Sequence, residues 1–598
     1  MKKLIFALVA LMAGLQLMAI PARPGKLTYV QPDGTTVTLF RHGDEFGHWT
    51  TDGRGRLIRQ DADGFYREVT DTDVPTLRRQ AAARRMQARA RAASRANASQ
   101  HVALGQKRFL VILVEFSDMK FTTAGDDPQA TFTQMLNSPG FSENGGVGSA
   151  RDFYYDNSHG LFEPVFDVFG PVTLEREYSY YGGNDYQGND QNAEQAVADG
   201  CKALDEEIDF SQYDNDGDGY VDLVFMYYAG HGEADYSDSD TIWPHQYELS
   251  AAGKSVTLDG KKVDSYACTN EIEGSGQYAN KLCGIGTACH EFGHAMGLPD
   301  FYDTDYDDNG QAAGMLGFST MDSGAYNGDG RRPCYFTTEE RIMLGWLKEE
   351  DAFRTFDKTG TYTLTSVDDN IAYRTFTDMD GEYFVYECRA SNGWDADLGA
   401  HGLIVYHVDK SRRNINVYGS YRVTPYELWE NWGSYNAINE NGSHPCCYVI
   451  PAADQGNLKF GYNGAYFNSA VYPQIPFPGR NKVTSYIPKS WNGVEGDVTF
   501  SDIVYAGGKV TLKAHVPSED LDYLTIADTG SYRSGERFAF SLVRPEEVEA
   551  PASVVWYYDD EPALADSVTL TAGAHTVEAV LTFADGRTQR LTLEIDVE

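Results

Sequence analysis

Two nearly continuous apolar runs mark the centre of a first folded domain. Residues 109–116 (FLVILVEF) and 223–228 (LVFMYY) contain almost no polar side chain, which is the pattern of strands buried on both faces of a sheet. Residues 192–206, between them, have helical character. The mixture is α/β-like up to about residue 350, and we expect strands and helices to share a core there.

Later in the chain, alternation of apolar and polar positions predicts mostly strands. Before residue 517 the predicted strands are residues 361–366, 383–387, 403–408 and 509–515. Pro517 starts a last section, in which about five short strands have the spacing of an immunoglobulin-type β-sandwich. Together with the mixed domain before them, these strands place the chain in the α+β class.

The first hundred residues follow a different pattern. Residues 20–77 alternate short apolar runs with turn sequences such as Pro32-Asp33-Gly34, which predicts small β-hairpins. Residues 78–95 then carry seven arginines among Ala and Gln. This basic, helix-forming segment is either a solvated linker or the boundary of a pro-segment that a trypsin-like protease cuts. In both interpretations it separates residues 20–98 from the mixed domain.

The extreme N-terminus has the pattern of a targeting segment. Two lysines precede the apolar residues 4–14, and Ala19 and Ala22 are small residues at plausible cleavage points. This predicts a secretory signal peptide over residues 1–19, since the apolar run is too short to span a bilayer. No cysteine follows the run to carry a lipid anchor, and no later run is long enough to cross a membrane. We therefore expect a secreted, extracellular protein.

Composition changes this picture in two respects. The chain has 598 residues, too many for one hydrophobic core, and its formal net charge is -39. Such acidity argues against a nucleic-acid partner, because phosphate binding needs a basic surface. It reflects either solubility outside the cell or carboxylates that bind cations. Eight cysteines permit disulfides in an exported protein, but their pairing cannot be deduced from the sequence.

Candidate metal chemistry is concentrated in the segment His290-Glu-Phe-Gly-His294. Residues four apart on a helix lie on one face, so His290 and His294 can share one zinc ion. Glu291, next to the first histidine, can reach a metal-bound water as general base. Because a five-residue match can occur by chance in a long chain, the surrounding residues must show whether this segment binds zinc.

Three residues downstream favour a zinc site. Gly297 can turn the chain sharply after the helix, and Asp300 then returns as a third ligand, or else serves as a turn residue or a calcium ligand. Met321, in a turn-rich stretch, looks like the Met-turn beneath the metal of metzincins, with a plain core methionine as the alternative. The metzincin pattern has histidine at the third ligand position, whereas this chain has aspartate, which zinc also accepts.

Three protein ligands would leave one zinc position open for water, as in catalytic zinc sites. Glu291 would take the proton of that water, hydroxide would attack a peptide carbonyl, and Glu291 would pass the proton to the leaving amine. A further donor would stabilise the oxyanion. The candidates are Tyr326, His231 and His245, each of which could equally belong to an ordinary polar wall.

A second motif, residues 213–222 (YDNDGDGYVD), has the spacing of a calcium loop. Its acidic positions, turn glycine and following carbonyl match positions 1, 3, 5, 6, 7 and 9 of such a loop, and the residues are Asp214, Asp216, Asp218, Gly219, Tyr220 and Asp222. Position 12 is Phe225, inside the next strand, so the second helix of an EF-hand is missing. We expect a structural calcium ion, with an acidic turn as the alternative. A further acidic cluster at residues 303–308 either binds a second calcium or is a solvated loop.

With the sequence on both sides, these motifs resemble the immune inhibitor A peptidases, the M6 family of zinc metallopeptidases. The similar blocks are residues 108–118, 148–160, 213–222, 240–245, 290–303, 318–324, 393–395 and 402–409. The resemblance implies a secreted endopeptidase that is made as a zymogen and holds zinc and calcium, with aspartate as the third zinc ligand. Residues 20–98 look like the propeptide of such enzymes. They contain no cysteine, so a carboxylate or a simple steric block would have to inhibit the site.

The expected domains are a signal peptide (1–19), a propeptide with an Arg-rich linker (20–98), a metzincin-like zincin catalytic domain (103–350), a β-rich domain (351–516) and an Ig-like β-sandwich (517–598). We expect a monomer that acts on protein or peptide substrates. Two other functions stay open. One is a secreted surface- or carbohydrate-binding protein with a structural metal site closed by four protein ligands; the other is an exopeptidase built on the same helix.

Overall fold

The computed structural model describes residues 18–61, 63–92, 103–184, 190–235, 239–304, 312–418, 421–458, 471–517, 524–528, 530–544, 548–563, 565 and 567–598. Most of the expected signal peptide, the end of the Arg-rich segment and residues 305–308 of the second acidic cluster lie outside them. The chain forms two compact units, residues 1–356 with 361–513, and residues 357–360 with 514–598. Within the described part, no helix combines the length and apolar character needed to cross a bilayer.

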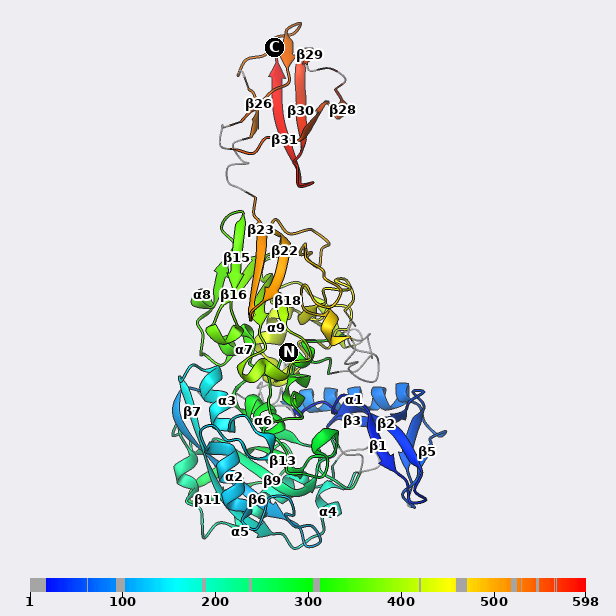
Figure 1. Cartoon of the computed structure of the whole chain (residues 1–598), viewed down its shortest axis with the longest axis vertical. Helices are drawn as coiled ribbons and strands as arrows, with labels where there is room; N and C mark the ends of the chain where they lie inside the picture. The colour runs from blue at the N-terminus through cyan, green and yellow to red at the C-terminus, as the bar shows by residue number, and fades with distance from the viewer. Residues whose placement is uncertain are drawn as a thin grey trace, which may run out of the picture. The chain divides into compact units, whose positions relative to one another are not determined.

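A five-stranded sheet forms the centre of the region that carries the His290–His294 motif (Figure 1). Its strand order is β10-β13-β9-β6-β7, with the bounds β6 Gly105–Glu115, β7 Phe162–Thr173, β9 Val224–His231, β10 His245–Glu248 and β13 Ser265–Ile272. Four strands run parallel, and β10 pairs antiparallel at one edge. The two apolar runs become the neighbouring strands β6 and β9, as their lack of alternation predicts.

Helices cover both faces of this sheet, so alternate residues of β6 enter different cores. The odd-numbered residues of 109–113 pack with the helices α2 (Pro128–Asn137), α3 (Ala150–Asn157) and α6 (Gly286–Met296). The even-numbered residues of 110–114 pack on the other face with α5 (Ala193–Ala203). The mixed α and β character expected of this region is confirmed.

The N-terminal region is an antiparallel meander followed by a helix, which confirms the predicted hairpins. The strands, in sheet order, are β1 Leu27–Val30, β2 Thr36–Asp44, β3 Gly47–Asp52, β4 Leu57–Gln60 and β5 Tyr66–Glu68. The Arg-rich segment forms α1 (Val74–Ala92), which packs on β3. Trp49 and Leu57 form a small apolar cluster with Tyr302, so this region touches the chain just beyond the metal motif.

Strands dominate the rest of the first unit. One sheet has the order β14-β16-β17-β18-β21, with the bounds Phe353–Thr355, Ala372–Phe376, Glu382–Arg389, Gly402–Asp409 and Cys447–Ile450. Another has the order β15-β23-β22, with the bounds Gly360–Leu364, Lys509–His515 and Thr499–Ala506. The remaining elements are α4 Tyr178–Gly182, β8 Tyr220–Val221, β11 Val256–Leu258, β12 Lys261–Val263, α7 Thr338–Met343, α8 Glu349–Ala352, β19 Ile415–Tyr418, β20 Tyr421–Val423, α9 Pro425–Glu430 and α10 Trp432–Tyr435.

In its described residues, the second unit is built from strands. A four-stranded sheet has the order β28-β27-β30-β31, with the bounds Glu561–Pro562, Ser553–Tyr558, Gly573–Thr582 and Thr588–Val597. Two small sheets pair β24 (Thr525–Ile526) with β26 (Leu542–Val543), and β25 (Arg537–Ala539) with β29 (Ser567–Thr569). The immunoglobulin type of this unit stays a prediction.

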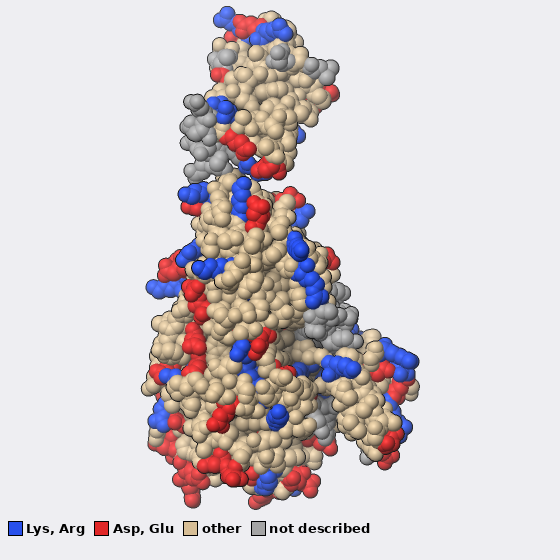
Figure 2. Space-filling model, in the orientation of Figure 1, with Lys and Arg blue, Asp and Glu red and all other residues tan. Residues whose placement is uncertain are grey.

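Charge and cysteines complete the description. Figure 2 shows Asp and Glu gathered at the end of the first unit that carries α5 and β11 in Figure 1; Asp205, Glu206 and Glu207, just after α5, are exposed there. All eight cysteines are buried thiols, and none forms a disulfide. Stability therefore rests on packing rather than on cross-links.

Candidate metal centre

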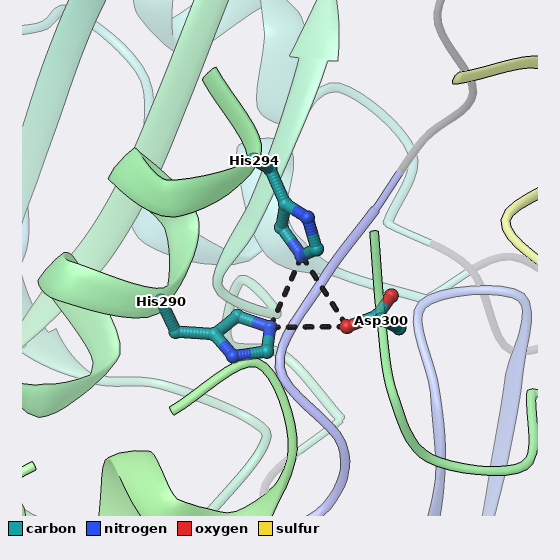
Figure 3. Close-up of side chains that lie close together, drawn as sticks. All are labelled: His290, His294 and Asp300. Carbon is teal, nitrogen blue, oxygen red and sulfur yellow. Dashed lines mark hydrogen bonds and ion pairs between the residues drawn. The ribbon is translucent and has the colours of Figure 1, made fainter. Parts of the chain in front are cut away.

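Helix α6 presents the two histidines of the metal motif on one face. It ends at Gly297, whose φ of 114° lies in the left-handed region that glycine adopts without strain. His290 and His294 are one turn apart and are 0% and 1% exposed. Figure 3 shows both imidazoles directed into the same buried space.

Asp300 follows the turn and completes a compact set of three donor atoms. Its Oδ1 lies 3.2 Å from Nε2 of His290 and 3.3 Å from Nε2 of His294, and the two Nε2 atoms are 3.1 Å apart (Figure 3). Ligand atoms around a tetrahedral zinc, with bonds of about 2.0–2.2 Å, are separated by about 3.3 Å. The three side chains therefore fit a single zinc ion.

Backbone carbonyls orient the two imidazoles. Nδ1 of His290 lies 2.8 Å from the Thr320 carbonyl oxygen, and Nδ1 of His294 lies 2.8 Å from that of Leu298. A histidine that donates from Nδ1 presents the lone pair of Nε2, which is the form that binds a metal. Burial also lowers the pKa of His290, which favours the same neutral form.

Asn436 holds the third donor. Its side-chain amide donates to Asp300 Oδ2 at 2.7 Å, and its Oδ1 accepts the Asp300 N–H at 2.9 Å. Although burial opposes ionisation, His294 and His290 keep the pKa of the Asp300 carboxyl well below its usual range. Asn436 is 136 residues away along the chain, and no local pattern marks it.

Met321 lies against helix α6 beneath this site. It is fully buried, and it approaches so closely that a Cβ placed on Gly293 would lie 2.6 Å from its sulfur. The Met321 carbonyl also accepts the N–H of Phe301, at 2.9 Å. The turn around Met321 is thus tied both to the helix and to the segment that carries Asp300.

Glu291 lies on the same helix and is also fully buried. Its Oε1 accepts the backbone N–H of Ile20 at 2.8 Å, and its Oε2 has no hydrogen-bond partner among the described residues. Burial raises the pKa of Glu291 well above its usual value, while the Ile20 N–H acts in the opposite direction. A buried carboxylate that contacts a backbone amide next to the metal ligands can act as a general base.

The N-terminal residues run through the space in front of this carboxylate. Met18 pairs antiparallel with Gln246 of the edge strand β10, through N–H to O distances of 3.0 and 2.6 Å. The ring N–H of Trp243 donates to the Ile20 carbonyl at 3.0 Å. In Figure 3 the faint blue trace of the N-terminal residues passes beside the three donors. An extended peptide thus adds to the sheet edge and passes the carboxylate of Glu291.

Two tyrosines donate to carbonyls of this N-terminal segment. Tyr326, one of the expected oxyanion donors, donates to Pro21 O at 2.8 Å. Tyr302, which the sequence did not single out, donates to Ala19 O at 2.8 Å. The other two expected donors lie at strand ends: His231 ends β9 and His245 begins β10, where its ring nitrogens lie 2.7 and 2.8 Å from a carbonyl and a tyrosine hydroxyl.

A second part of the N-terminal region approaches the site from the β2–β3 hairpin. Asp44 and Glu45 at its tip are buried, 1% and 7% exposed. Burial raises the pKa of Glu45 well above its usual value, and the charges of Asp44 and Asp300 raise it further. Two carboxyl groups of this hairpin therefore lie in the electrostatic field of Asp300.

The predicted calcium loop brings together three of its acidic side chains. Carboxylate oxygens of Asp214, Asp216 and Asp218 lie within 4.8 Å of one another. Gly219 has a φ of 95° and makes the sharp turn, and the next residue, Tyr220, begins β8. A cation can fit among these oxygens, although Lys261 Nζ, 2.5 Å from Asp214, already neutralises part of their negative charge.

The last loop ligand expected from the sequence, Asp222, is turned inward. Its carboxylate accepts from the Asn215 side chain at 2.6 Å and is 4% exposed. Of the second acidic cluster, Asp303 is buried, and residues 305–308 lie outside the described part of the chain.

Comparison with known proteins agrees with the resemblance seen in the sequence. Residues 98–348 match the family described as immune inhibitor A peptidase M6, catalytic domain. The chain is 28% identical over 285 residues to Pre-pro-metalloprotease PrtV of Vibrio cholerae, covering 40% of this chain and 30% of that protein. It is 24% identical over 276 residues to Immune inhibitor A of Bacillus thuringiensis subsp. alesti, covering 39% of each.

The matched region thus spans 30% to 39% of the length of these relatives. A crystal structure of OgpA from Akkermansia muciniphila aligns over 84% of this chain and 94% of that one, at 12% identity and a TM-score of 0.20. The expected resemblance to the immune inhibitor A peptidases is confirmed by the family match and by the two relatives.

Proposed function

We propose, from the premise that residues 98–348 are an immune inhibitor A type (M6) metallopeptidase catalytic domain, that the chain is a secreted zinc-dependent endopeptidase made as a zymogen. The observation that carries this proposal is the donor set of His290, His294 and Asp300, whose atoms lie 3.1–3.3 Å apart beside the buried Glu291. Three ligands are the number that catalytic zinc sites have, whereas structural sites have four.

The three donors would hold zinc, and Asn436, Thr320 and Leu298 would orient them. When bound, zinc supplies the Lewis acidity that lowers the pKa of a water molecule and polarises the peptide carbonyl. The residues of the chain then bind the substrate, exclude bulk water and move the proton. Burial of the whole set strengthens each of these electrostatic interactions.

Glu291 is the general base. It takes the proton of the attacking water and delivers it to the nitrogen of the leaving amine. The Ile20 N–H, 2.8 Å from Oε1, occupies the place that we assign to that nitrogen. By the same analogy, the Ala19 carbonyl stands for the carbonyl under attack.

Tyr302 is then the best placed donor for the oxyanion. Its hydroxyl lies 2.8 Å from the Ala19 oxygen, which is within the range of an effective oxyanion donor. Tyr326 contacts a carbonyl two residues further along, at Pro21, and we assign it to substrate binding. This assignment revises the list of donors expected from the sequence.

Zymogen latency is supported by the residues that lie over Glu291 and the three donors, a space that we call the cleft. Residues 20–23, which remain after removal of the expected signal peptide, pass Glu291, and the β2–β3 hairpin brings the carboxyl groups of Asp44 and Glu45 toward Asp300. Both the steric block and the carboxylate block expected from the sequence thus have residues that could provide them. The relative from Vibrio cholerae is named a pre-pro-metalloprotease, and release of the N-terminal region would open the cleft.

Calcium is proposed for the loop at residues 214–222, which precedes the core strand β9. The oxygens of Asp214, Asp216 and Asp218, together with the Tyr220 carbonyl, offer the hard ligands that calcium prefers, and Asp222 would have to turn toward the ion to join them. Its role would be structural, because the loop is followed by β8, which pairs with β12, and then by β9 of the central sheet.

The test combines a metal count with proteolysis. Cleavage of casein by the full-length protein is measured before and after limited trypsin treatment. Bound zinc is measured by inductively coupled plasma mass spectrometry. Wild type should bind about one zinc and release internal fragments, whereas Glu291→Ala should keep the zinc and lose activity. Equal activity of Glu291→Ala would refute the mechanism. A zinc-loaded protein that cleaves nothing before or after trypsin would refute the function, and released single residues would indicate an exopeptidase.

A further inference from the structure

The segment that crosses the cleft carries one long basic side chain, that of Arg23. The Ile20 N–H donates to Glu291, and we assign the Ile20 nitrogen to the leaving amine. Counting Ile20 as the first residue after the cleaved bond, Arg23 is the fourth. Its backbone N–H bonds to Ala234 O at 2.8 Å, which fixes its position on the cleft wall. The inference below rests on the proposed function, since it treats this segment as occupying the substrate cleft.

The Arg23 guanidinium is enclosed by three carboxylates. It pairs closely with Glu273 and Asp329, and Asp235 lies 3.6 Å away. The side chains of Arg23, Glu273 and Asp235 are 7%, 7% and 9% exposed, whereas Asp329 is 22% exposed. The three acids therefore form a pocket, which we call the acidic pocket, that is buried at its base and reaches the surface at Asp329.

The acidic pocket is shaped for a flat, charged group. A Cβ on Gly276 would lie 2.8 Å from the Arg23 Nη2 and 2.4 Å from an Asp329 oxygen, so only glycine leaves room there. The Tyr326 ring forms one wall, 5.5 Å from the guanidinium carbon. Tyr326 also donates to the Pro21 carbonyl, so the same side chain lines the cleft and the pocket.

The charges of the acidic pocket do not balance without a cation. Arg331 pairs with Glu273 at 2.7 Å, which sets one fixed positive charge against the two carboxylates of Glu273 and Asp329. Burial and the neighbouring Glu273 raise the pKa of Asp235 to about 8. Removal of the Arg23 guanidinium would thus leave buried acidic groups under-neutralised, which is costly unless another cation enters.

We propose that the acidic pocket is a substrate subsite that selects an arginine or lysine side chain at the fourth residue after the cleaved bond. In the latent chain Arg23 occupies it, and after activation a basic residue of the substrate replaces Arg23. Arginine is preferred over lysine, because a guanidinium fork can bond to two carboxylates at once. The alternative is that the pocket only anchors the N-terminal segment and plays no part in selecting substrates.

The test compares two quenched peptides that are identical except for the fourth residue after the cut, arginine in one and citrulline in the other. Citrulline has the shape of arginine without its charge. With trypsin-activated full-length enzyme, kcat/KM for the arginine peptide should be about 10- to 100-fold higher, as expected for bonds between charged, buried groups. Asp329→Asn and Glu273→Gln should each lower that ratio several-fold.

The control variant is Asp205→Asn, which removes an exposed carboxylate after α5 and should keep the wild-type ratio. Equal kcat/KM values for the two peptides with wild-type enzyme would overturn the inference, whatever the variants do, so a variant that fails to fold does not remove the test. Cleavage of both peptides without preference leaves the proposed function intact. Failure to cleave casein or either peptide, with zinc bound, refutes the proposed function itself.

Discussion

The buried ion pair between Arg85 of α1 and Asp44 of β2 offers a sharp test of the proposed latency. The two side chains are 2% and 1% exposed, and the Arg85 guanidinium also lies 4.9 Å from the centre of the Phe46 ring. Removing one partner of a buried pair costs about 3–5 kcal/mol, because the other charge stays buried; an exposed pair contributes about 1 kcal/mol or less. Arg85→Ala should therefore raise the population with an open cleft by about 100-fold or more.

The assay is casein cleavage by full-length protein without trypsin, with thermal unfolding as the check on folding. Arg56→Ala is the matched control, because Arg56 also bridges acids of the N-terminal meander but is 49% exposed. We expect activity from Arg85→Ala and latency from wild type and Arg56→Ala. Burial raises the pKa of Asp44, so the effect should be larger at pH 8 than at pH 5, where the carboxyl is more easily neutralised. Equal latency of both variants at both pH values would refute the reasoning.

Three further outcomes are expected. Burial, Arg78 and Arg41 lower the pKa of His42 to about 3 from an ordinary value of 6.5. Because the unfolded chain binds a proton more readily than the folded one, the N-terminal meander should lose stability as pH falls below about 6.5, by about 2 kcal/mol at pH 5. In urea unfolding between pH 5 and pH 8, His42→Gln should flatten this dependence. Calcium should raise the thermal midpoint of wild type but not of Asp216→Asn, with magnesium as the control ion; equal shifts in both proteins would leave the loop without a calcium role. Gly293→Ala gains about 1 kcal/mol of helix propensity, but its Cβ would collide with Met321. We therefore expect a net loss of about 1–2 kcal/mol in unfolding free energy and weaker zinc retention in a chelator titration. A stabilised variant would show that the contact relaxes freely.

Local patterns predicted the elements on which the site is built. The apolar runs at 109–116 and 223–228 became β6 and β9, and the expected helix at 192–206 became α5. The one-turn spacing of His290 and His294, and the glycine after their helix, have the geometry expected of them. These features depend on periodicity and on backbone sterics, which act over a few residues and are therefore visible in a sequence.

Contacts between distant segments could not be predicted in the same way. Asn436 holds Asp300 across 136 residues, and Ile20 meets Glu291 across 271. Tyr302 lies two residues beyond Asp300, yet only the path of the N-terminal segment shows what its hydroxyl faces. Extended segments such as residues 18–23 have no periodicity of their own, and their place is decided by the surface that receives them.

The position of Ile20 would link the expected export to the proposed latency. The signal peptide expected from the sequence ends at Ala19, so a signal peptidase cutting there would turn the Ile20 amide into a free ammonium group. That group would face Glu291 Oε1 at the 2.8 Å now spanned by the amide, and an amide bond to the carboxylate would become a buried ion pair. The residues in front of Ile20, including the strand partner of Gln246, would be gone. Export would thus replace the peptide that lies across Glu291 with a charged chain end. This ammonium group would have to leave before Glu291 could act as the proposed general base.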